Sequence, residues 1–201
     1  MTIEFSSRMA DVGPYPKAAT YAHGGNLVKL ASNETPWAPH QAVMDAIASH
    51  LESLNRYPDP GSTALRKALS ERYDLAPDRI TLGNGSCDIL LGAAQALLEP
   101  GAEIVYAWPS FSMYPHLAAM TGARAVTVSL TEDGKHDLDA MLREITAATR
   151  IVIVCNPNNP TSTALPLAQI AAFLDEVPPH VCAIVDEAYC EFNLLDDPDA
   201  S

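Results

Sequence analysis

Three polar stretches of this sequence stand where short apolar segments end. "RITL" leads into "GNGSCD" (83–88), "RIVIV" into "CNPNNPTST" (155–163), and "VCAIV" into "DEAY" (186–189). The first places small residues before a helix, and the unpaired N–H groups and partial positive charge of a helix N-terminus suit a phosphate. The last begins with a carboxylate that closes a buried strand, and such a group needs a cation or several hydrogen-bond donors.

Each stretch also has a plainer interpretation. "GNGS" lacks the lysine of a Walker A loop and equally fits a tight turn capped by Ser86. Asp186 equally fits a residue that caps the turn after its strand. The middle stretch carries three Asn and two Pro in nine residues, and taken alone it marks either a turn or a site.

The segments around these stretches alternate between strand-like and helical patterns. Strands are predicted for five apolar runs, at 79–82, 103–107, 123–130, 150–154 and 181–186. Apolar residues at helical spacing predict helices between them, one of which Asp137 is expected to cap. This alternation indicates an α/β fold with a mainly parallel sheet covered by helices on both faces. Because ligands bind beyond the carboxyl ends of strands in such sheets, we expect the three polar stretches to face one crevice.

The first third of the chain has a different character. Residues 1–38 are interrupted by Pro and Gly, which predicts an irregular N-terminal arm. From His40 the apolar residues recur at helical spacing through Leu54, and Ser62 is expected to cap the next helix.

The composition excludes several classes of function. The 201 residues include 25 Asp and Glu against 12 Lys and Arg, which gives a net charge of −13. Such a surface repels phosphate backbones and anionic lipid, so no nucleic acid and no membrane is expected as a partner. The four cysteines form no C-x-x-C pair and the six histidines no H-x-H pattern, so neither a disulfide scaffold nor a metal site is predicted. Without a signal-peptide pattern, a cytoplasmic location is expected.

Six motifs together resemble one known family. In chain order they are "LASNETPW" (30–37), "RYPDPG" (56–61), "LGNGSCD" (82–88), "WPSFSMY" (108–114), "CNPNNPTST" (155–163) and "VDEAYCEF" (185–192). A single short motif is weak evidence, whereas six in the same order are specific. The chain resembles the fold-type I pyridoxal-phosphate-dependent aminotransferases, and within them the N-terminal part of the histidinol-phosphate aminotransferase group.

The resemblance implies a role for each polar strand end. Asp186 matches the carboxylate that pairs with the pyridine nitrogen of pyridoxal 5'-phosphate, where a buried anion favours the protonated ring. Asn159 and Tyr189 match the two donors to the phenolate oxygen of this cofactor. The Asn159–Pro160 bond is a candidate for a cis peptide, as in the relatives.

The resemblance also implies cofactor-binding residues outside these two stretches. Phe111 matches the aromatic residue that stacks on the cofactor ring, although plain core packing would also explain it. The cofactor phosphate is expected to lie at the N-terminus of the helix that begins in the glycine-rich turn. The residues that match this phosphate site are Gly85, Ser86, Cys87 and Asp88.

Three further residues match positions that depend on a partner subunit or on substrate. Tyr57 matches a tyrosine that reaches the phosphate from the other subunit of a homodimer, although a surface tyrosine in a turn is the simpler alternative. Asn33 and Tyr15 match positions of the N-terminal arm that close over the substrate. The resemblance therefore divides the chain into an arm with the first helix (1–55) and the first part of an incomplete large cofactor-binding domain (56–201).

The chain departs from the family pattern at two positions and in one larger respect. Ser162 stands where the family has Gly, and Phe111 where close relatives have Tyr. Transamination needs a lysine that holds the cofactor and moves a proton, and none of the four lysines follows the last predicted strand. The Schiff-base lysine is therefore expected beyond Ser201, so no catalytic residue is assigned here and this chain alone is expected to be inactive.

The predicted function is that of an aminotransferase. It would move an amino group between histidinol phosphate, or a similar amine, and 2-oxoglutarate. A pyridoxal-phosphate-dependent decarboxylase or lyase and an aromatic aminotransferase share the same cofactor residues and remain alternatives. An inert phosphate-binding module on the same sheet is a third possibility.

Overall fold

The computed structural model describes residues 7, 12, 28 and 30–193. Of these, 28 and 30–82 belong to one compact unit, and 83–193 belong to another together with 7 and 12. The functional boundary at residue 55 stays a prediction. None of the helices within the described ranges is long and apolar enough to cross a membrane.

The described part of the unit before residue 83 contains two α-helices, α1 (Gln41–His50) and α2 (Thr63–Tyr73). Short 3-10 helices follow each of them, at Leu51–Ser53 and Pro77–Arg79. The helix predicted from His40 is therefore present. Its apolar stripe is more than half exposed, at Val43, Ile47, Leu51 and Leu54.

The beginning of α2 corrects one expectation. Ser62 occupies the position before the helix, but its φ is 48° and its side chain makes no capping hydrogen bond. The carboxylate of Asp59 accepts instead from the backbone N–H groups of Gly61 (2.9 Å) and Thr63 (2.8 Å). These bonds, chiefly the one from Thr63, lower the pKa of Asp59. An Asp side chain two residues before a turn can accept from the turn N–H groups in place of the expected Ser cap. The position of Ser62 in the sequence alone does not reveal this competition.

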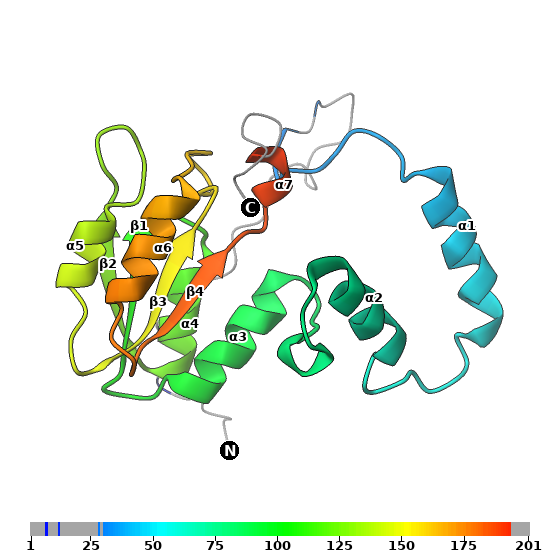
Figure 1. The fold of residues 1–201 in the computed structure, drawn as a ribbon, viewed down its shortest axis with the longest axis horizontal. Helices are drawn as coiled ribbons and strands as arrows, with labels where there is room; N and C mark the ends of the chain where they lie inside the picture. The colour runs from blue at the N-terminus through cyan, green and yellow to red at the C-terminus, as the bar shows by residue number, and fades with distance from the viewer. Residues whose placement is uncertain (1–6, 8–11, 13–27, 29, 194–201) are drawn as a thin grey trace, which may run out of the picture. The chain divides into compact units, whose positions relative to one another are not determined.

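The unit from residue 83 onward is an α/β fold, as predicted. Its sheet has the strand order β2-β1-β3-β4, and every neighbouring pair is parallel (Figure 1). The strands are β1 (Glu103–Trp108), β2 (Arg124–Ser129), β3 (Thr149–Cys155) and β4 (Cys182–Asp186). The helices are α3 (Ser86–Leu97), α4 (Met113–Thr121), α5 (Leu138–Arg143), α6 (Leu167–Glu176) and the short α7 (Cys190–Asn193).

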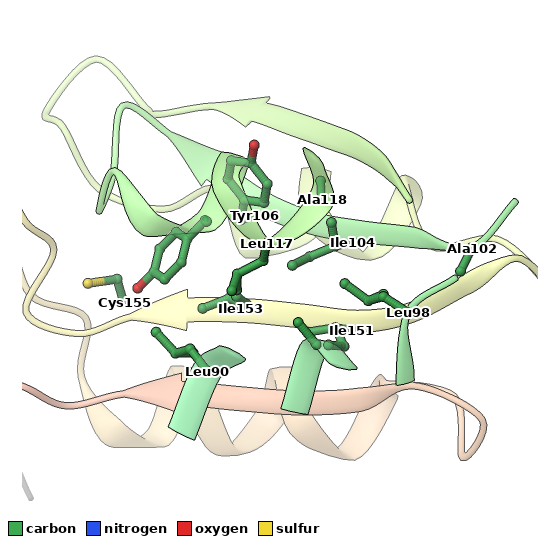
Figure 2. Packing of buried hydrophobic residues seen from close by; sticks show 12 residues of the cluster. Leu90, Leu98, Ala102, Ile104, Tyr106, Leu117, Ala118, Ile151, Ile153 and Cys155 are labelled. Carbon is green, nitrogen blue, oxygen red and sulfur yellow. The ribbon is translucent and has the colours of Figure 1, made fainter. Parts of the chain in front are cut away.

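Alternate residues of the strands enter two separate cores. On one face, Ile104, Tyr106, Ile151 and Ile153 pack with residues of α3 and α4, as Figure 2 shows for Leu90 and Leu117. On the other face lie the intervening strand residues, with one side chain each from α5 and α6: Val105, Ala107, Val152, Val154, Met141 and Phe173. Both faces of the sheet are apolar because both are covered, which explains the continuous apolar runs.

One predicted strand is absent. Residues 79–82 pair with no neighbouring strand in the described part of the chain, although Ile80 has extended backbone angles (φ −110°, ψ 122°). An apolar run shows that a segment is suited to burial, but a strand also needs a neighbour to receive its hydrogen bonds. Asp137 behaves as predicted, since its Oδ1 accepts from the N–H of Ala140 (2.9 Å) at the start of α5.

Candidate active site

Asp186 closes β4 and lies against the end of β3. It is paired in register with Cys155, and its carbonyl accepts from the N–H of Asn156 (2.9 Å). Only 7% of the residue is exposed. Its carboxylate accepts from the Tyr114 hydroxyl (2.8 Å) and from the N–H of Ala188 (3.3 Å). The second bond is the turn-capping contact that the plainer interpretation predicted.

The sheet has a second buried carboxylate, and the comparison is informative. Glu103, at the opposite end of the sheet, forms an ion pair with Arg124 and accepts from Thr146 (2.7 Å) and Thr149 (3.2 Å). These contacts, led by the Thr146 hydroxyl, lower the pKa of Glu103. Asp186 has no ion pair with any described Lys, Arg or His. A buried carboxylate with two neutral donors is suited to receive a cation from outside the chain.

Tyr114 is the nearest partner of this carboxylate. It is fully buried on α4, and burial, then Cys155 and Asp186, raises its pKa well above the ordinary value. The phenol therefore stays protonated and donates to Asp186. Phe111 contacts the Tyr114 ring edge-on, with ring centroids 5.7 Å apart, and packs against the core at the same time. Phe111 therefore packs in the core and also lies beside Tyr114, the residue that bonds Asp186. This position leaves open both interpretations of Phe111, core packing and stacking on a cofactor ring.

The three Asn residues of the 155–163 loop have different surroundings. The amide of Asn156 is buried and bonds Leu165 twice, donating to its carbonyl (3.2 Å) and accepting from its N–H (2.7 Å). Asn158 is also buried and fully engaged inside the protein. The Asn159 side chain is partly exposed and bonds no group in the described ranges. Asn159 is therefore the amide of this loop that is available to a ligand.

The cis peptide predicted at Asn159–Pro160 is present, and Asn156–Pro157 and Trp108–Pro109 are also cis. Ser162 has a φ of 55°, in the left-handed region that favours Gly. The family resemblance predicts Gly at this position, and Ser162 adopts a backbone conformation that Gly takes without strain.

The glycine-rich turn leads directly into α3. Gly85 has a φ of 74°, which glycine adopts without strain, and no side chain caps the helix. No backbone acceptor in the described residues pairs with the N–H groups of Ser86 and Cys87. Asp88 behaves differently, because its Oδ2 accepts from the backbone and side-chain amides of Asn84 (3.0 and 3.3 Å). The Asp88 carboxylate thus shapes the turn.

Cys87 lies in the first turn of α3. Burial raises the pKa of the Cys87 thiol, and the charge of Asp186 raises it further. Burial also raises the pKa of Cys155. Both thiols are therefore uncharged. Leu90 of α3 belongs to the same core cluster as Cys155 at the end of β3.

The remaining predicted residues are less defined. Tyr189 is partly buried and its ring lies near that of Phe192, with centroids 6.3 Å apart. Tyr57 and Asn33 are exposed and belong to the unit before residue 83. Tyr15 lies outside the described residues.

The sequence motifs did not single out four residues at this edge of the sheet: Tyr114, Ser110, His136 and Asn158. A buried tyrosine needs a partner for its hydroxyl, and a strand-terminal carboxylate needs a donor, so Tyr114 could have been sought on these grounds. Nothing in the sequence marks His136, which lies between β2 and α5.

His136 gives the fold a pH dependence that can be measured. It is buried, its Nε2 lies 3.1 Å from the Asn158 Oδ1, and its Nδ1 has no described partner. Burial lowers its pKa below the ordinary 6.5. The unfolded chain therefore takes up this proton before the folded chain does. The free energy of unfolding is therefore unaffected by His136 above about pH 6.5. It decreases as the pH falls below this value, and the decrease stops once the pH is below the pKa of His136 in the folded protein.

We expect His136→Gln to remove this segment of the pH dependence, measured as the urea midpoint of the native protein between pH 7.5 and 5. His180→Gln is the matched control because His180 is exposed, and it should leave the profile unchanged. Identical profiles for wild type and His136→Gln would contradict the assignment.

Comparison with known proteins agrees with this geometry. The family model described as aminotransferase class I and II matches residues 25–200. An aromatic amino acid aminotransferase of Thermobifida fusca (strain YX) is 44% identical over 193 residues, 96% of this chain and 53% of that protein. A protein of the same description from Rhodococcus jostii (strain RHA1) is 48% identical over 179 residues, 88% of this chain and 50% of that protein.

Solved structures give the same result. Histidinol-phosphate aminotransferase from Sinorhizobium meliloti, in complex with pyridoxal-5'-phosphate, has a TM-score of 0.87 at 26% identity, covering 95% of this chain and 52% of that chain. A Thermus thermophilus aspartate aminotransferase double mutant has a TM-score of 0.80 at 26% identity, covering 92% and 53%.

The chain thus spans about half the length of the curated relatives it matches. The resemblance to the fold-type I aminotransferases is confirmed, while the narrower histidinol-phosphate group stays a prediction. With the parallel sheet, the polar strand ends and a family model that covers residues 25–200, the chain belongs to the aminotransferase class I and II family.

Proposed function

We propose that the native protein carrying this chain is a pyridoxal-phosphate-dependent aminotransferase that moves an amino group between an amino acid and a 2-oxo acid. The observation that supports it most directly is Asp186, a buried carboxylate with two neutral donors and no cation among the described residues. A protonated pyridine ring would supply the missing charge. When bound, pyridoxal phosphate serves as the electron sink for the substrate.

The other residues at this edge fit the same cofactor. The N–H groups of Ser86 and Cys87, beside Gly85, would hold the phosphate at the start of α3, where the helix dipole favours an anion. Asp88 takes part through the shape of the turn, because its carboxylate already bonds Asn84. Asn159 and Tyr189 would donate to the phenolate oxygen, and Phe111 would stack on the ring.

The residues outside this edge complete the proposal. Tyr57 would reach the phosphate of the other subunit in a homodimer, which is consistent with its 93% exposure in this single chain. Asn33 and Tyr15 would contact the substrate from the N-terminal arm.

We propose an aromatic amino acid as the amino donor, and 2-oxoglutarate as its acceptor. The relatives described as aromatic amino acid aminotransferases are 44% and 48% identical, which makes them much nearer in sequence than the histidinol-phosphate aminotransferase at 26%. Histidinol phosphate remains the second candidate because that structure has a TM-score of 0.87 over 95% of this chain.

Glutamate formation tests both candidates. The purified native protein, supplied with pyridoxal phosphate and 2-oxoglutarate, is expected to form glutamate with phenylalanine or tyrosine at a higher kcat/KM than with histidinol phosphate. The reverse ranking would overturn the donor and leave the reaction class intact. Carbon dioxide release without glutamate would indicate a decarboxylase, and cofactor binding without turnover of any donor would indicate an inert binding module.

A further inference from the structure

A buried hydrogen-bond network joins the loops that follow β1, β2 and β3. Asn158 lies at its centre, 2% exposed. Its Oδ1 accepts from the hydroxyl of Ser110 (2.7 Å) and lies 3.1 Å from the Nε2 of His136. Its Nδ2 donates to the carbonyl of Pro109 (3.2 Å) and to the hydroxyl oxygen of Thr161 (2.8 Å). Each of the three loops contributes at least one partner.

The chemistry of these partners fixes the orientation of every group. A proline carbonyl can only accept, so the Asn158 atom that faces it is the NH₂ group. The Oδ1 must then receive both of its bonds as an acceptor, which requires a proton on the His136 Nε2. All four hydrogen-bonding positions of Asn158 are thereby filled. Because the central amide is fully bonded, the network has a single favourable geometry.

The backbone of Asn158 closes the loop that carries Asn159. Its N–H donates to the carbonyl of Thr163 (2.8 Å), and its carbonyl accepts from the N–H of Ser162 (2.7 Å). The hydroxyls of Thr161 and Thr163 both donate to the carbonyl of Gly134 (3.0 and 2.7 Å). The loop is therefore fixed on both sides of Asn159, whose own side chain bonds no described group.

We propose that Asn158, held by Ser110 and His136, is the positioning residue for Asn159, and that the network fixes in advance the backbone position from which the Asn159 amide donates to bound ligand. The inference rests on the proposed function, because Asn159 is the donor to the cofactor there. Asn158 touches no ligand itself and acts only through its neighbour. A donor whose backbone is already held in place has only its side-chain rotation left to be ordered on binding, so the network would raise affinity without making a contact.

A double-mutant cycle on cofactor affinity tests the inference. The dissociation constant of pyridoxal 5'-phosphate is measured by absorbance titration of the apo form of the native protein for wild type, Asn159→Ala, Asn158→Ala and the double variant. Each single variant is expected to weaken binding about 5- to 30-fold, the size of one or two hydrogen bonds. The double variant should weaken it no more than Asn159→Ala alone, because Asn158 acts through Asn159.

Two further variants keep the result interpretable. Ser110→Ala removes one bond of the network and replaces Asn158→Ala in the cycle if that protein does not fold. Thr149→Val removes a buried hydroxyl at the opposite end of β3 and should lower thermal stability without changing cofactor affinity. Multiplying losses in the double variant would overturn the positioning role. If wild type itself does not bind the cofactor, the proposed function fails instead.

Discussion

Replacing Asp186 by Asn is expected to reduce the rate of amino transfer by at least about 100-fold. Breaking a buried charge pair by removing one partner costs about 3–5 kcal/mol, which corresponds to roughly 100- to several thousand-fold. The amide has the same shape: its oxygen can still accept from the N–H of Ala188, and its NH₂ group can donate to the Tyr114 hydroxyl oxygen, which then accepts instead of donating. What it lacks is the negative charge that keeps the pyridine nitrogen protonated. The measurement is single-turnover kinetics with the preferred amino donor.

A matched control separates this charge from acidity in general. Asp139 is exposed in the first turn of α5, so Asp139→Asn removes the same charge elsewhere and should change the rate less than twofold. Thermal unfolding of both variants shows whether the protein remains folded. An Asp186→Asn protein that is folded and keeps more than about a tenth of the wild-type rate would contradict the proposed pairing. Removing one partner of a buried charge pair should reduce the rate by much more than about tenfold.

The sheet could be predicted from the sequence because its cause is local. A strand covered on both faces must be apolar between its ends, and 103–107, 150–154 and 181–186 all show such a run in the sequence and a strand in the structure. The run at 79–82 has the same composition but has no strand partner in the described residues. Pairing is a property of two segments, which the composition of one segment does not contain.

The site was predictable only as far as its motifs extend. Asp186 and Tyr114 are 72 residues apart in sequence, and their hydrogen bond exists because β4 ends beside the buried face of α4. The same limit applies to Asn156, Asn158 and Asn159. They have identical side chains, and the resemblance selected Asn159 for its place in a motif. In the structure the other two amides are engaged inside the protein, which is consistent with that prediction.

The two carboxylates of the sheet show the limit most clearly. Glu103 and Asp186 each lie at one end of an apolar strand, and burying either carboxylate without a partner costs free energy. Only the structure shows that Arg124 neutralises Glu103, whereas Asp186 has no described cation. The sequence thus predicts that a buried charge must be compensated, and the three-dimensional arrangement shows which of the two has no cation among the described residues.

Replacing Leu117 by Ala is expected to lower the free energy of unfolding by about 2–5 kcal/mol, because it removes buried methyl groups and leaves a cavity. Leu117 is 0% exposed on α4 and belongs to the core between the sheet, α3 and α4 (Figure 2). That loss is a large part of the roughly 5–15 kcal/mol by which domains are stable. The measurement is urea unfolding of the native protein, followed by circular dichroism.

Met120 provides the comparison on the same helix. It is 40% exposed, so Met120→Ala removes a side chain of similar size from a place where water already reaches it, and the cost should stay below about 1 kcal/mol. Both variants change helix propensity in the same direction, so this term largely cancels in the comparison. Equal shifts of the urea midpoint would mean that helix formation, and not burial against the sheet, holds α4 in place. A Leu117→Ala midpoint well below that of Met120→Ala is the expected result. That result would mean that packing of α4 in this core holds Tyr114 in the position from which it bonds Asp186.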